Sequence, residues 1–370
     1  MKTFLVFLLL TVTFLSSAQD LALARLDGKY GYINRDGEMV IDNQYLDAGS
    51  FSNDVAAVMK DDKWGFIDRA GEWVISPVYD RVKRFDSGIA VVLKDDKWIY
   101  IDKEGNQINN FPQTDKLYDF YEGRAIIRRG ENVGIINNKG EIIVEPEYQE
   151  IKDYKNGYSK VKKYDRWGFI DKAGKVVVDI DYDDVGEYNG DAIWAKKGEV
   201  FGIVKDNSFN PLKDVVKIWD FNDEGVTYAQ KADLVGYINT AGEWIIIPQF
   251  EKARAFVNGL APVYLDREWG YIDLEGNWVV EPKYRDAEVF SESGLAPVKI
   301  KRWGFIDTAG KMVISPDYDI TAGGFGLFKF EEKGFIEGMS RVKTREGWGY
   351  LDTEGNLLGD QWYENLELFK

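Results

Sequence analysis

The chain has 370 residues, of which 45% are hydrophobic and 15% aromatic, and it contains twelve tryptophans but neither cysteine nor histidine. The two absences exclude Ser-His-Asp and Cys-His nucleophilic pairs, zinc sites built from the usual nitrogen and sulfur ligands, and disulfide bonds. The formal net charge of −16 argues against nucleic acid and anionic lipid as partners, because both are negatively charged themselves.

The first predicted element is an apolar segment at the N-terminus. Lys2 precedes an almost wholly apolar run at 4–15, and Ser16-Ser17-Ala18 supplies small residues for a signal peptidase. This pattern predicts a signal peptide at 1–18, and the run is shorter than the roughly 20 residues of a membrane span. We therefore expect an exported protein, periplasmic or extracellular, without membrane insertion after signal removal. The lack of cysteine excludes a lipoprotein.

The remaining residues, 19–370, repeat with a period of about 34. The string Lys63-Trp64-Gly65-Phe66-Ile67-Asp68 returns almost unchanged at 166–171 and 302–307. Its glycine is taken here as repeat position 0, and later positions are counted from it. The ten residues at position 0 are Gly31, Gly65, Ile99, Gly134, Gly168, Gly202, Gly236, Gly270, Gly304 and Gly349. Ten copies predict a single repeat array that fills 19–370.

Two aromatic positions recur after the glycine. Position 14 is aromatic in Tyr45, Tyr79, Tyr148, Tyr182, Phe250, Tyr284, Tyr318 and Tyr363, and position 20 in Phe51, Phe85, Tyr154, Tyr188, Phe256, Phe290 and Phe369. Residues required in nearly every copy are best explained by stacking between neighbouring copies. The same interpretation applies to the six tryptophans of the repeated string, which are Trp64, Trp98, Trp167, Trp269, Trp303 and Trp348.

Each copy predicts three short strands. A lead-in strand precedes the Trp-Gly strand, Asp68 to Gly71 predicts a type I turn that closes a hairpin through a bulge, and a third strand at 72–76 stops at Pro77. Asn207 replaces the turn glycine in the sixth copy, where Asn tolerates the left-handed conformation. An irregular return carries the two aromatic positions.

The fold class is therefore all-β, because the strands are short, aromatic and β-branched. We expect the three-stranded repeats to stack into an open, curved, solenoid-like array, since propeller blades usually have four strands in roughly 40 to 50 residues. The C-terminal Glu367-Leu368-Phe369-Lys370 lacks the lead-in strand of other copies and also favours an open end. A propeller-like ring, or two rings, is the alternative.

The chain resembles the bacterial WG-repeat proteins. The residues that carry the resemblance are Trp64-Gly65, Trp167-Gly168, Trp269-Gly270, Trp303-Gly304 and Trp348-Gly349, with segments such as 75–79. The resemblance covers nearly all of 19–370. It implies an interaction or binding scaffold, often exported, without shared catalytic residues.

Candidate contact residues lie outside the repeated string. Trp73, Trp244 and Trp278 share position 8 and form a possible aromatic ladder for sugar rings, although apolar residues at this position in other copies favour packing. Trp194 and Trp219 lie outside that register. Phe325 and Phe328 belong to an eleven-residue insertion in the ninth copy.

Other departures from the repeat are also candidate surfaces, because binding often occurs where a regular scaffold is interrupted. Ile99 replaces the glycine of the third copy, and Val216 stands where the sixth copy should have an aromatic residue.

The acidic residues at 179–187 form no calcium loop, because the central glycine and closing glutamate are missing. They are expected to be a solvated surface. We expect no metal, no cofactor and no catalytic residues. The preferred function is a non-enzymatic exported scaffold that binds a protein or cell-envelope component. The alternatives are a carbohydrate-binding module and, more remotely, a carboxylate-based glycoside hydrolase.

Overall fold

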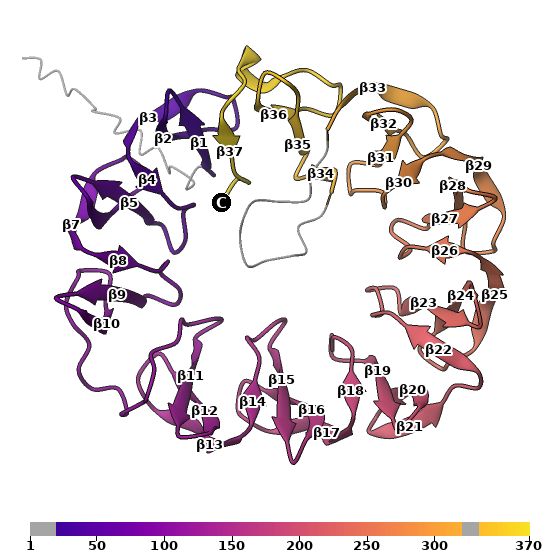
Figure 1. Cartoon of the computed structure of the whole chain (residues 1–370), viewed down its shortest axis with the longest axis horizontal. Coiled ribbons are helices and arrows are strands. Elements are labelled where there is room, and N and C mark those ends of the chain that lie inside the picture. The colour runs from indigo at the N-terminus through magenta and orange to yellow at the C-terminus, as the bar shows by residue number, and fades with distance from the viewer. Residues whose placement is uncertain (1–19, 320–332) are drawn as a thin grey trace, which may run out of the picture.

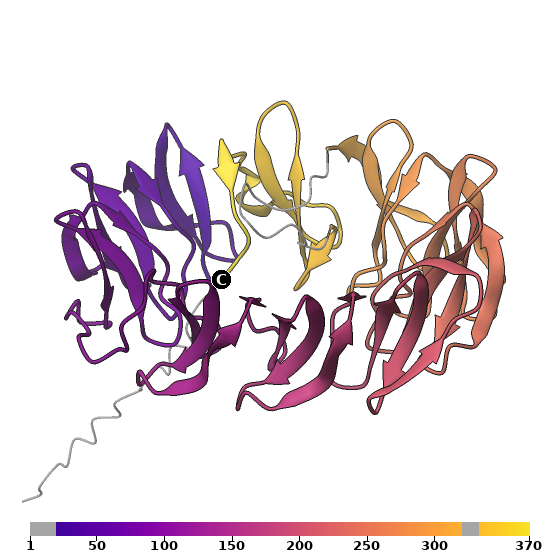
Figure 2. The ribbon, with the colours of Figure 1, turned by 60° about the horizontal axis from the view of Figure 1, so that its bottom comes forward.

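The structure is a computed structural model that describes residues 20–319 and 333–370. Within this part of the chain, 37 strands form ten small sheets, and Figure 1 shows the sheets arranged as the blades of a closed ring. The view turned by 60° shows the blades standing side by side around a central opening (Figure 2). The fold is a ten-bladed β-propeller-like ring, which is the alternative predicted from the repeat. The predicted signal peptide, 1–18, lies outside the described residues.

A complete blade has four antiparallel strands, counted from the opening outward. The innermost strands are β37 (Asn365–Leu366), β4 (Asp47–Ala48), β8 (Arg81–Val82), β14 (Glu150–Ile151), β18 (Asp184–Val185), β22 (Val215–Ile218), β26 (Lys252–Ala253), β30 (Asp286–Ala287) and β34 (Phe335–Ile336). The second strands are β1 (Ala22–Leu26), β5 (Ala56–Lys60), β9 (Ala90–Lys94), β11 (Arg124–Arg129), β15 (Tyr158–Lys163), β19 (Ala192–Lys197), β23 (Val226–Lys231), β27 (Ala261–Leu265), β31 (Ala296–Lys299) and β35 (Met339–Lys343).

The third strand of each blade carries the repeated Trp-Gly string or its substitute. These strands are β2 (Lys29–Ile33), β6 (Lys63–Ile67), β10 (Lys97–Ile101), β12 (Asn132–Asn137), β16 (Arg166–Asp171), β20 (Val200–Lys205), β24 (Leu234–Asn239), β28 (Glu268–Ile272), β32 (Trp303–Ile306) and β36 (Trp348–Leu351). The outer strands are β3 (Met39–Tyr45), β7 (Trp73–Tyr79), β13 (Ile142–Tyr148), β17 (Val176–Tyr182), β21 (Ser208–Pro211), β25 (Trp244–Phe250), β29 (Trp278–Tyr284) and β33 (Met312–Tyr318). A single 3₁₀ turn, η1 (Leu358–Asp360), is described.

The ring is closed by the two ends of the described chain. β37 pairs with β1, with Leu366 opposite Ala24, and the backbones of Leu21 and Lys370 are joined by two hydrogen bonds of 3.2 Å. Blade 1 therefore takes its innermost strand from the C-terminal end and its other three strands from the N-terminal end. Blades 2 to 10 follow in chain order.

The expectation of an open array is therefore wrong, for two physical reasons. The irregular return contains a two-residue strand such as Asp47–Ala48, so most blades have four strands and not three. The lead-in strand that seemed to be missing at the C-terminus is Ala22–Leu26, supplied by the N-terminal end. The end of the sequence is one half of a joint and not a ragged end.

The predicted turn between the third and outer strands is confirmed. In blade 2, the Asp68 side-chain Oδ1 accepts hydrogen bonds from the backbone N–H groups of Ala70 and Glu72, both at 2.9 Å. Gly71 has a φ of +83°, which glycine adopts without strain. In blade 6, Asn207 has the predicted left-handed φ of +57°, but the hairpin is tighter, because Lys205 pairs directly with Ser208.

The glycine at position 0 allows two strands to approach closely. Trp64 lies opposite Tyr79 and Phe66 opposite Ile75, so the outer strand bulges over the single residue Gly65. A Cβ atom at Gly65 would lie 2.5 Å from the Ile75 carbonyl oxygen. Any side chain here would collide with the outer strand.

Blade 3 lacks both this glycine and an outer strand. Ile99 stands at position 0, and the blade has only β8, β9 and β10. Phe111, from the segment that leads to blade 4, packs on Tyr100 with ring centroids 5.2 Å apart. The departure from the repeat predicted at Ile99 thus coincides with the loss of an outer strand.

The hydrophobic core lies between blades. One cluster joins blades 8 and 9 and consists of Leu260, Trp269, Tyr271, Val280, Tyr284, Ala287, Phe290, Ala296, Val298 and Ile306. Because each sheet alone has too few residues to bury a core, the blades are stabilised by their neighbours. Within the described ranges, no helix has the length and apolar character needed to cross a bilayer.

Candidate functional site: cavities between blades

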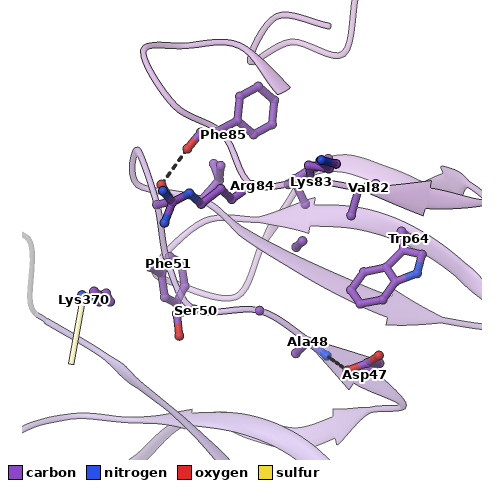
Figure 3. A pocket seen from close by; sticks show the side chains of 15 residues that line it. Asp47, Ala48, Ser50, Phe51, Trp64, Val82, Lys83, Arg84, Phe85 and Lys370 are labelled. Atoms are coloured by element: carbon purple, nitrogen blue, oxygen red, sulfur yellow. Dashed lines mark hydrogen bonds between the residues drawn. The ribbon is translucent and has the colours of Figure 1, made fainter. Parts of the chain in front are cut away.

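Cavities recur at equivalent places where two blades meet near the central opening. One of about 550 Å³ lies between blades 2 and 3 (Figure 3), and one of about 530 Å³ lies between blades 5 and 6. A third, of about 320 Å³, is centred on blades 8 and 9 and is also lined by residues of blades 7 and 10. Each is lined by the position-20 aromatic residues of two consecutive blades, namely Phe51 and Phe85, Tyr154 and Tyr188, and Phe256 and Phe290. The repeat therefore produces a series of related sites around the opening.

The walls of these cavities are fixed by contacts that cross from blade to blade. Phe85 packs against Phe66 of the preceding blade with ring centroids 4.7 Å apart. The Tyr32 hydroxyl donates a 2.7 Å hydrogen bond to the Gly49 carbonyl of the next blade, and Tyr237 bonds the Arg254 carbonyl in the same way at 2.8 Å. Buried aromatic rings with satisfied hydroxyls hold a cavity in one shape.

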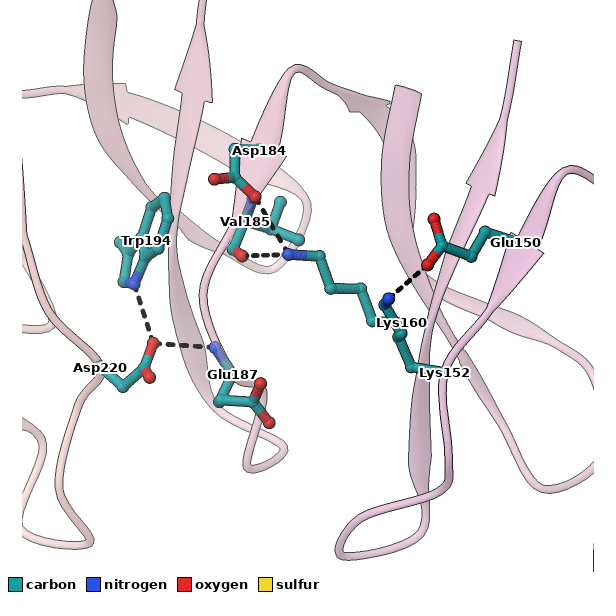
Figure 4. A network of polar contacts seen from close by, with 8 residues as sticks. All are labelled: Glu150, Lys152, Lys160, Asp184, Val185, Glu187, Trp194 and Asp220. Carbon is teal, nitrogen blue, oxygen red and sulfur yellow. Dashed lines mark hydrogen bonds and ion pairs between the residues drawn. The ribbon is translucent and has the colours of Figure 1, made fainter. Parts of the chain in front are cut away.

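Charged groups cross the same boundaries (Figure 4). The Lys160 Nζ on β15 lies 3.0 Å from the Asp184 carboxylate and 2.7 Å from the Val185 carbonyl oxygen of blade 6. The Trp194 indole N–H donates to the Asp220 carboxylate of blade 7 at 2.8 Å. The polar contacts between blades 5 and 6 therefore differ from those between blades 6 and 7, although the strands are arranged alike.

The Trp-Gly tryptophans lie beneath cations of the chain itself. Lys160 lies 4.8 Å above the Trp167 ring, Arg254 4.9 Å above Trp269, Lys299 5.6 Å above Trp303, and Arg341 4.9 Å above Trp348. A cation over an indole face is an attractive arrangement. The cation differs in sequence position and type from one blade to the next, but in each of these four blades it lies within 6 Å of the ring centroid.

The stacking interpretation of the repeated tryptophans holds for five of the six. Trp269 and Trp303 are buried, at 7% exposure each, and Trp64, Trp167 and Trp348 are half-buried and pack against core clusters. Trp98 is 42% exposed, because blade 3 has no outer strand to cover it.

The cavity between blades 5 and 6 has an acid beside it. Burial raises the pKa of Asp153, and the negative charge of Asp119 raises it further, while Arg84, Lys152 and Lys83 lower it in part. One Asp119 oxygen is buried without a hydrogen-bond partner among the described residues. The boundary of blades 4 and 5 therefore holds two carboxylates that interact unfavourably.

The structure does not bring Trp73, Trp244 and Trp278 together. They lie on β7, β25 and β29, with blade 2 across the ring from blades 7 and 8 (Figure 1). Trp73 packs edge-on against Tyr45 of the preceding blade, with centroids 6.1 Å apart. Trp278 contacts Phe250 in the same way at 6.0 Å. Trp73 and Trp278 thus pack against the outer strand of the preceding blade, and Trp244 packs against a core cluster of blades 6 and 7.

Trp194 and Trp219 lie at one boundary, between blades 6 and 7. Trp194 bonds Asp220, the residue after Trp219, and Trp219 stacks on Tyr228 with ring centroids 4.5 Å apart. Phe325 and Phe328 lie outside the described residues.

The acids at 179–187 do not act as a cluster, because each of four carboxylates has its own cation. Asp181 pairs with Lys197 at 2.6 Å, Asp184 with Lys160 at 3.0 Å and Glu187 with Lys155 at 3.6 Å, and Asp183 pairs with Arg166. The expected solvated acidic surface is a set of surface ion pairs.

Sequence reasoning missed the residues that shape the cavities. Gly49 and Ala57, at positions 18 and 26 of the first copy, line the largest of the three. Their signal is visible only when the copies are aligned on position 0, since the equivalent residues in the fourth copy are Lys152 and Lys160. These two positions line a cavity in both copies, and the residues there decide whether its wall carries lysines.

The fold and its cavities define a repeat propeller, with related sites at the boundaries of its blades. The model of the WG containing repeat matches residues 30–64, 64–98, 134–167, 167–201, 236–267, 269–301 and 303–325, more than half of the chain. The chain belongs to the family of WG-repeat proteins.

No curated protein matches the chain. Among solved structures, it is similar to a eukaryotic initiation factor at 11% identity, with a TM-score of 0.46, over 80% of this chain and 95% of that one. AztD from Citrobacter koseri has 13% identity and a TM-score of 0.31 over 80% and 93%. The extracellular domain of a hybrid two-component system from B. thetaiotaomicron has 10% identity and a TM-score of 0.29 over 92% and 56%. These similarities carry no functional conclusion.

Proposed function

We propose that the protein is an exported, non-enzymatic scaffold that binds a protein or cell-envelope component at the boundaries of its blades. The observation that carries this proposal is the recurrence of cavities of about 550, 530 and 320 Å³ at equivalent boundaries, each with different charged residues on one frame. Several related sites around one opening suit a partner that contacts many blades.

Site-specific photo-crosslinking tests where the partner binds. A benzophenone amino acid is placed at Ser50 or Asn258, which line cavities, and at the exposed outer-strand residues Val78 or Ile247 as matched controls. Mature protein is incubated with the envelope fraction and the medium of its own host. The proposal predicts one adduct shared by the cavity positions and absent from the controls. Adducts at the outer strands alone would contradict it.

Export is tested separately by the N-terminus of the protein recovered from its host. Cleavage after Ala18 predicts a first residue of Gln19 and recovery outside the cytoplasm. Intact-mass spectrometry of the recovered chain distinguishes this from an uncleaved Met1, which would exclude the signal peptide.

A further inference from the structure

The cavity between blades 2 and 3 is lined by two small residues of blade 2, Gly49 and Ala57. Ala57 lies on β5, and Gly49 directly follows β4. The Gly49 N–H donates a 2.8 Å hydrogen bond to the Ala57 carbonyl oxygen. In blade 5 the same two places hold Lys152 and Lys160, and both lie within 6 Å of the Trp167 ring centroid. Blade 2 therefore has the same strand arrangement as blade 5 but lacks the two lysines.

The ring left uncovered is Trp64. Trp64 lines the cavity between blades 2 and 3 (Figure 3), as do Gly49 and Ala57. No lysine or arginine of the described ranges lies over the Trp64 ring. Trp98 of blade 3 is uncovered too, but it lies on an open surface and lines none of the three cavities. Of the three cavities described above, the one between blades 2 and 3 is the one lined by an uncovered tryptophan of the repeated string.

A carboxylate lies on the same face of the blade. Asp47 pairs with Met59, and Met59 pairs with Trp64, so these three side chains form one row across β4, β5 and β6. Asp47 and Trp64 are two strand spacings apart, roughly 10 Å. A cation held over the Trp64 ring would therefore have a negative group within the same cavity.

The opposite wall is basic, but its charges are engaged with blade 4. Lys83 and Arg84 line the cavity from blade 3. The Lys83 Nζ lies 3.0 Å from the Asp119 carboxylate, and the Arg84 guanidinium lies 5.0 Å from the centroid of the Tyr121 ring. Lys370, at the end of the chain, also lines the cavity.

We propose that the cavity between blades 2 and 3 binds a lysine or arginine side chain of a partner protein, seated on Trp64 with Asp47 as its counter-ion. The ligand takes the place that Lys160, Arg254 and Arg341 occupy above their own tryptophans. The net charge of −16 favours a basic partner through long-range attraction. This inference rests on the proposed scaffold function and names the chemistry of one of its sites.

The test uses the full mature chain and a probe peptide, Gly-Lys-Gly with both ends blocked, together with the same peptide carrying Nε-acetyl-lysine. Binding is followed through the indole N–H resonances of the tryptophans, with the Trp64 signal identified from Trp64→Phe. The charged peptide should shift the Trp64 resonance in a saturable manner. The acetylated peptide should bind about tenfold more weakly, as expected for loss of a cation–π contact.

Gly49→Lys is the decisive variant, because the protein's own side chain would then provide the cation over Trp64 and compete with the peptide. A Cβ atom at Gly49 meets only the Ala57 carbonyl oxygen, at 4.0 Å, so the fold tolerates the change. Binding of the charged peptide should fall about tenfold or more. Thr308→Lys, an exposed position of blade 9 whose equivalents in other copies include Arg69 and Lys103, adds the same charge elsewhere and should leave binding unchanged.

Three results would overturn the cavity assignment: equal binding of the two peptides, unchanged binding by Gly49→Lys, or no shift of the Trp64 resonance. Photo-crosslinked adducts at the other boundaries would persist in that case, and the scaffold function would stand. If photo-crosslinking gives no adduct at any cavity position of the otherwise unchanged protein, the scaffold function itself is wrong.

Discussion

The glycine at position 0 allows the outer strand of a blade to bulge over its neighbour. The Ile75 carbonyl oxygen would lie 2.5 Å from a Cβ atom at Gly65, whereas Gly49, also on blade 2, has no atom closer than 4.0 Å. The two glycines have different tasks. The first permits the bulged outer strand, and the second leaves space in a cavity.

Gly65→Ala should therefore lower the free energy of unfolding by about 1–3 kcal/mol, the usual cost of forcing an extra carbon into a packed site. Gly49→Ala, the matched control, should change it by less than about 0.5 kcal/mol. Thermal or urea unfolding of both variants measures the difference. Equal effects at the two positions would refute the close-approach explanation.

Asp153 gives a pH-dependent prediction at the same scale. Burial and the Asp119 charge raise its pKa, so folding favours the protonated carboxyl. Its contribution to stability is fully present below the unfolded pKa and is lost as the pH rises through the raised folded pKa. Asp153→Asn should raise the Tm at pH 7, and this gain should disappear below about pH 4, near the unfolded pKa.

The Tm of both proteins is measured from pH 3 to pH 7. Asp36→Asn, at an exposed turn position, controls for the loss of one negative charge from an acidic chain. An Asp153→Asn variant that is less stable than the parent at pH 7 would show that the attraction of Arg84 and Lys152 outweighs burial.

At the scale of elements, the first half of β10 forms an uncovered edge of blade 3, whereas Tyr100 and Ile101 are paired with residues 107–108. The Leu93 carbonyl accepts a hydrogen bond from Asp80 on the inner side, so the backbone groups of Trp98, opposite Leu93, point outward. In blade 10, the equivalent N–H of Trp348 donates to the Tyr363 carbonyl at 2.8 Å. No backbone partner for the Trp98 N–H exists among residues 20–319 and 333–370.

Hydrogen exchange should report this difference. The Trp98 amide is expected to exchange much faster than the Trp348 amide, since an unpaired and exposed N–H needs no opening of the sheet. Exchange followed by NMR or by mass spectrometry of short peptides compares the two positions. Comparable protection of both amides would show that the β10 edge is covered in solution.

The sequence predicted the elements that have a local signal and missed those that have none. The Trp-Gly strand, the Asp68–Gly71 turn and the all-β class follow from residue type and spacing. A two-residue strand such as Asp47–Ala48 has no periodicity to detect, and its absence from the prediction led to the open array. Residue spacing also could not show that Trp73 lies across the ring from Trp278.

At the scale of the whole molecule, closure depends on contacts that no short segment specifies. Leu366 on β37 is fully buried in a cluster with Ala22, Ala24, Ile33, Tyr350 and Tyr363, residues of the first and last blades. The joint is therefore a piece of hydrophobic core and not only a pair of backbone hydrogen bonds.

Leu366→Ala should lower the free energy of unfolding by about 2–5 kcal/mol, because it creates a cavity in this core. Leu46→Ala, at a side chain that is 50% exposed, should have an effect of less than about 0.5 kcal/mol. Denaturant unfolding measures both, and small-angle scattering shows whether the ring of Leu366→Ala has opened. A Leu366→Ala protein as stable as the parent would mean that the ring does not depend on its joint.

The joint also sets the order in which the molecule can be completed. The Gly28 N–H donates a hydrogen bond to the carboxylate of Glu364, 336 residues away in the sequence. β1 therefore has no inner partner strand until β37 has been synthesised. Every shorter product is an incomplete arc with unpaired strand edges, and such edges promote association between chains. A chain without β37 would therefore leave the inner edge of β1 unpaired, whereas pairing of β37 with β1 covers that edge within blade 1.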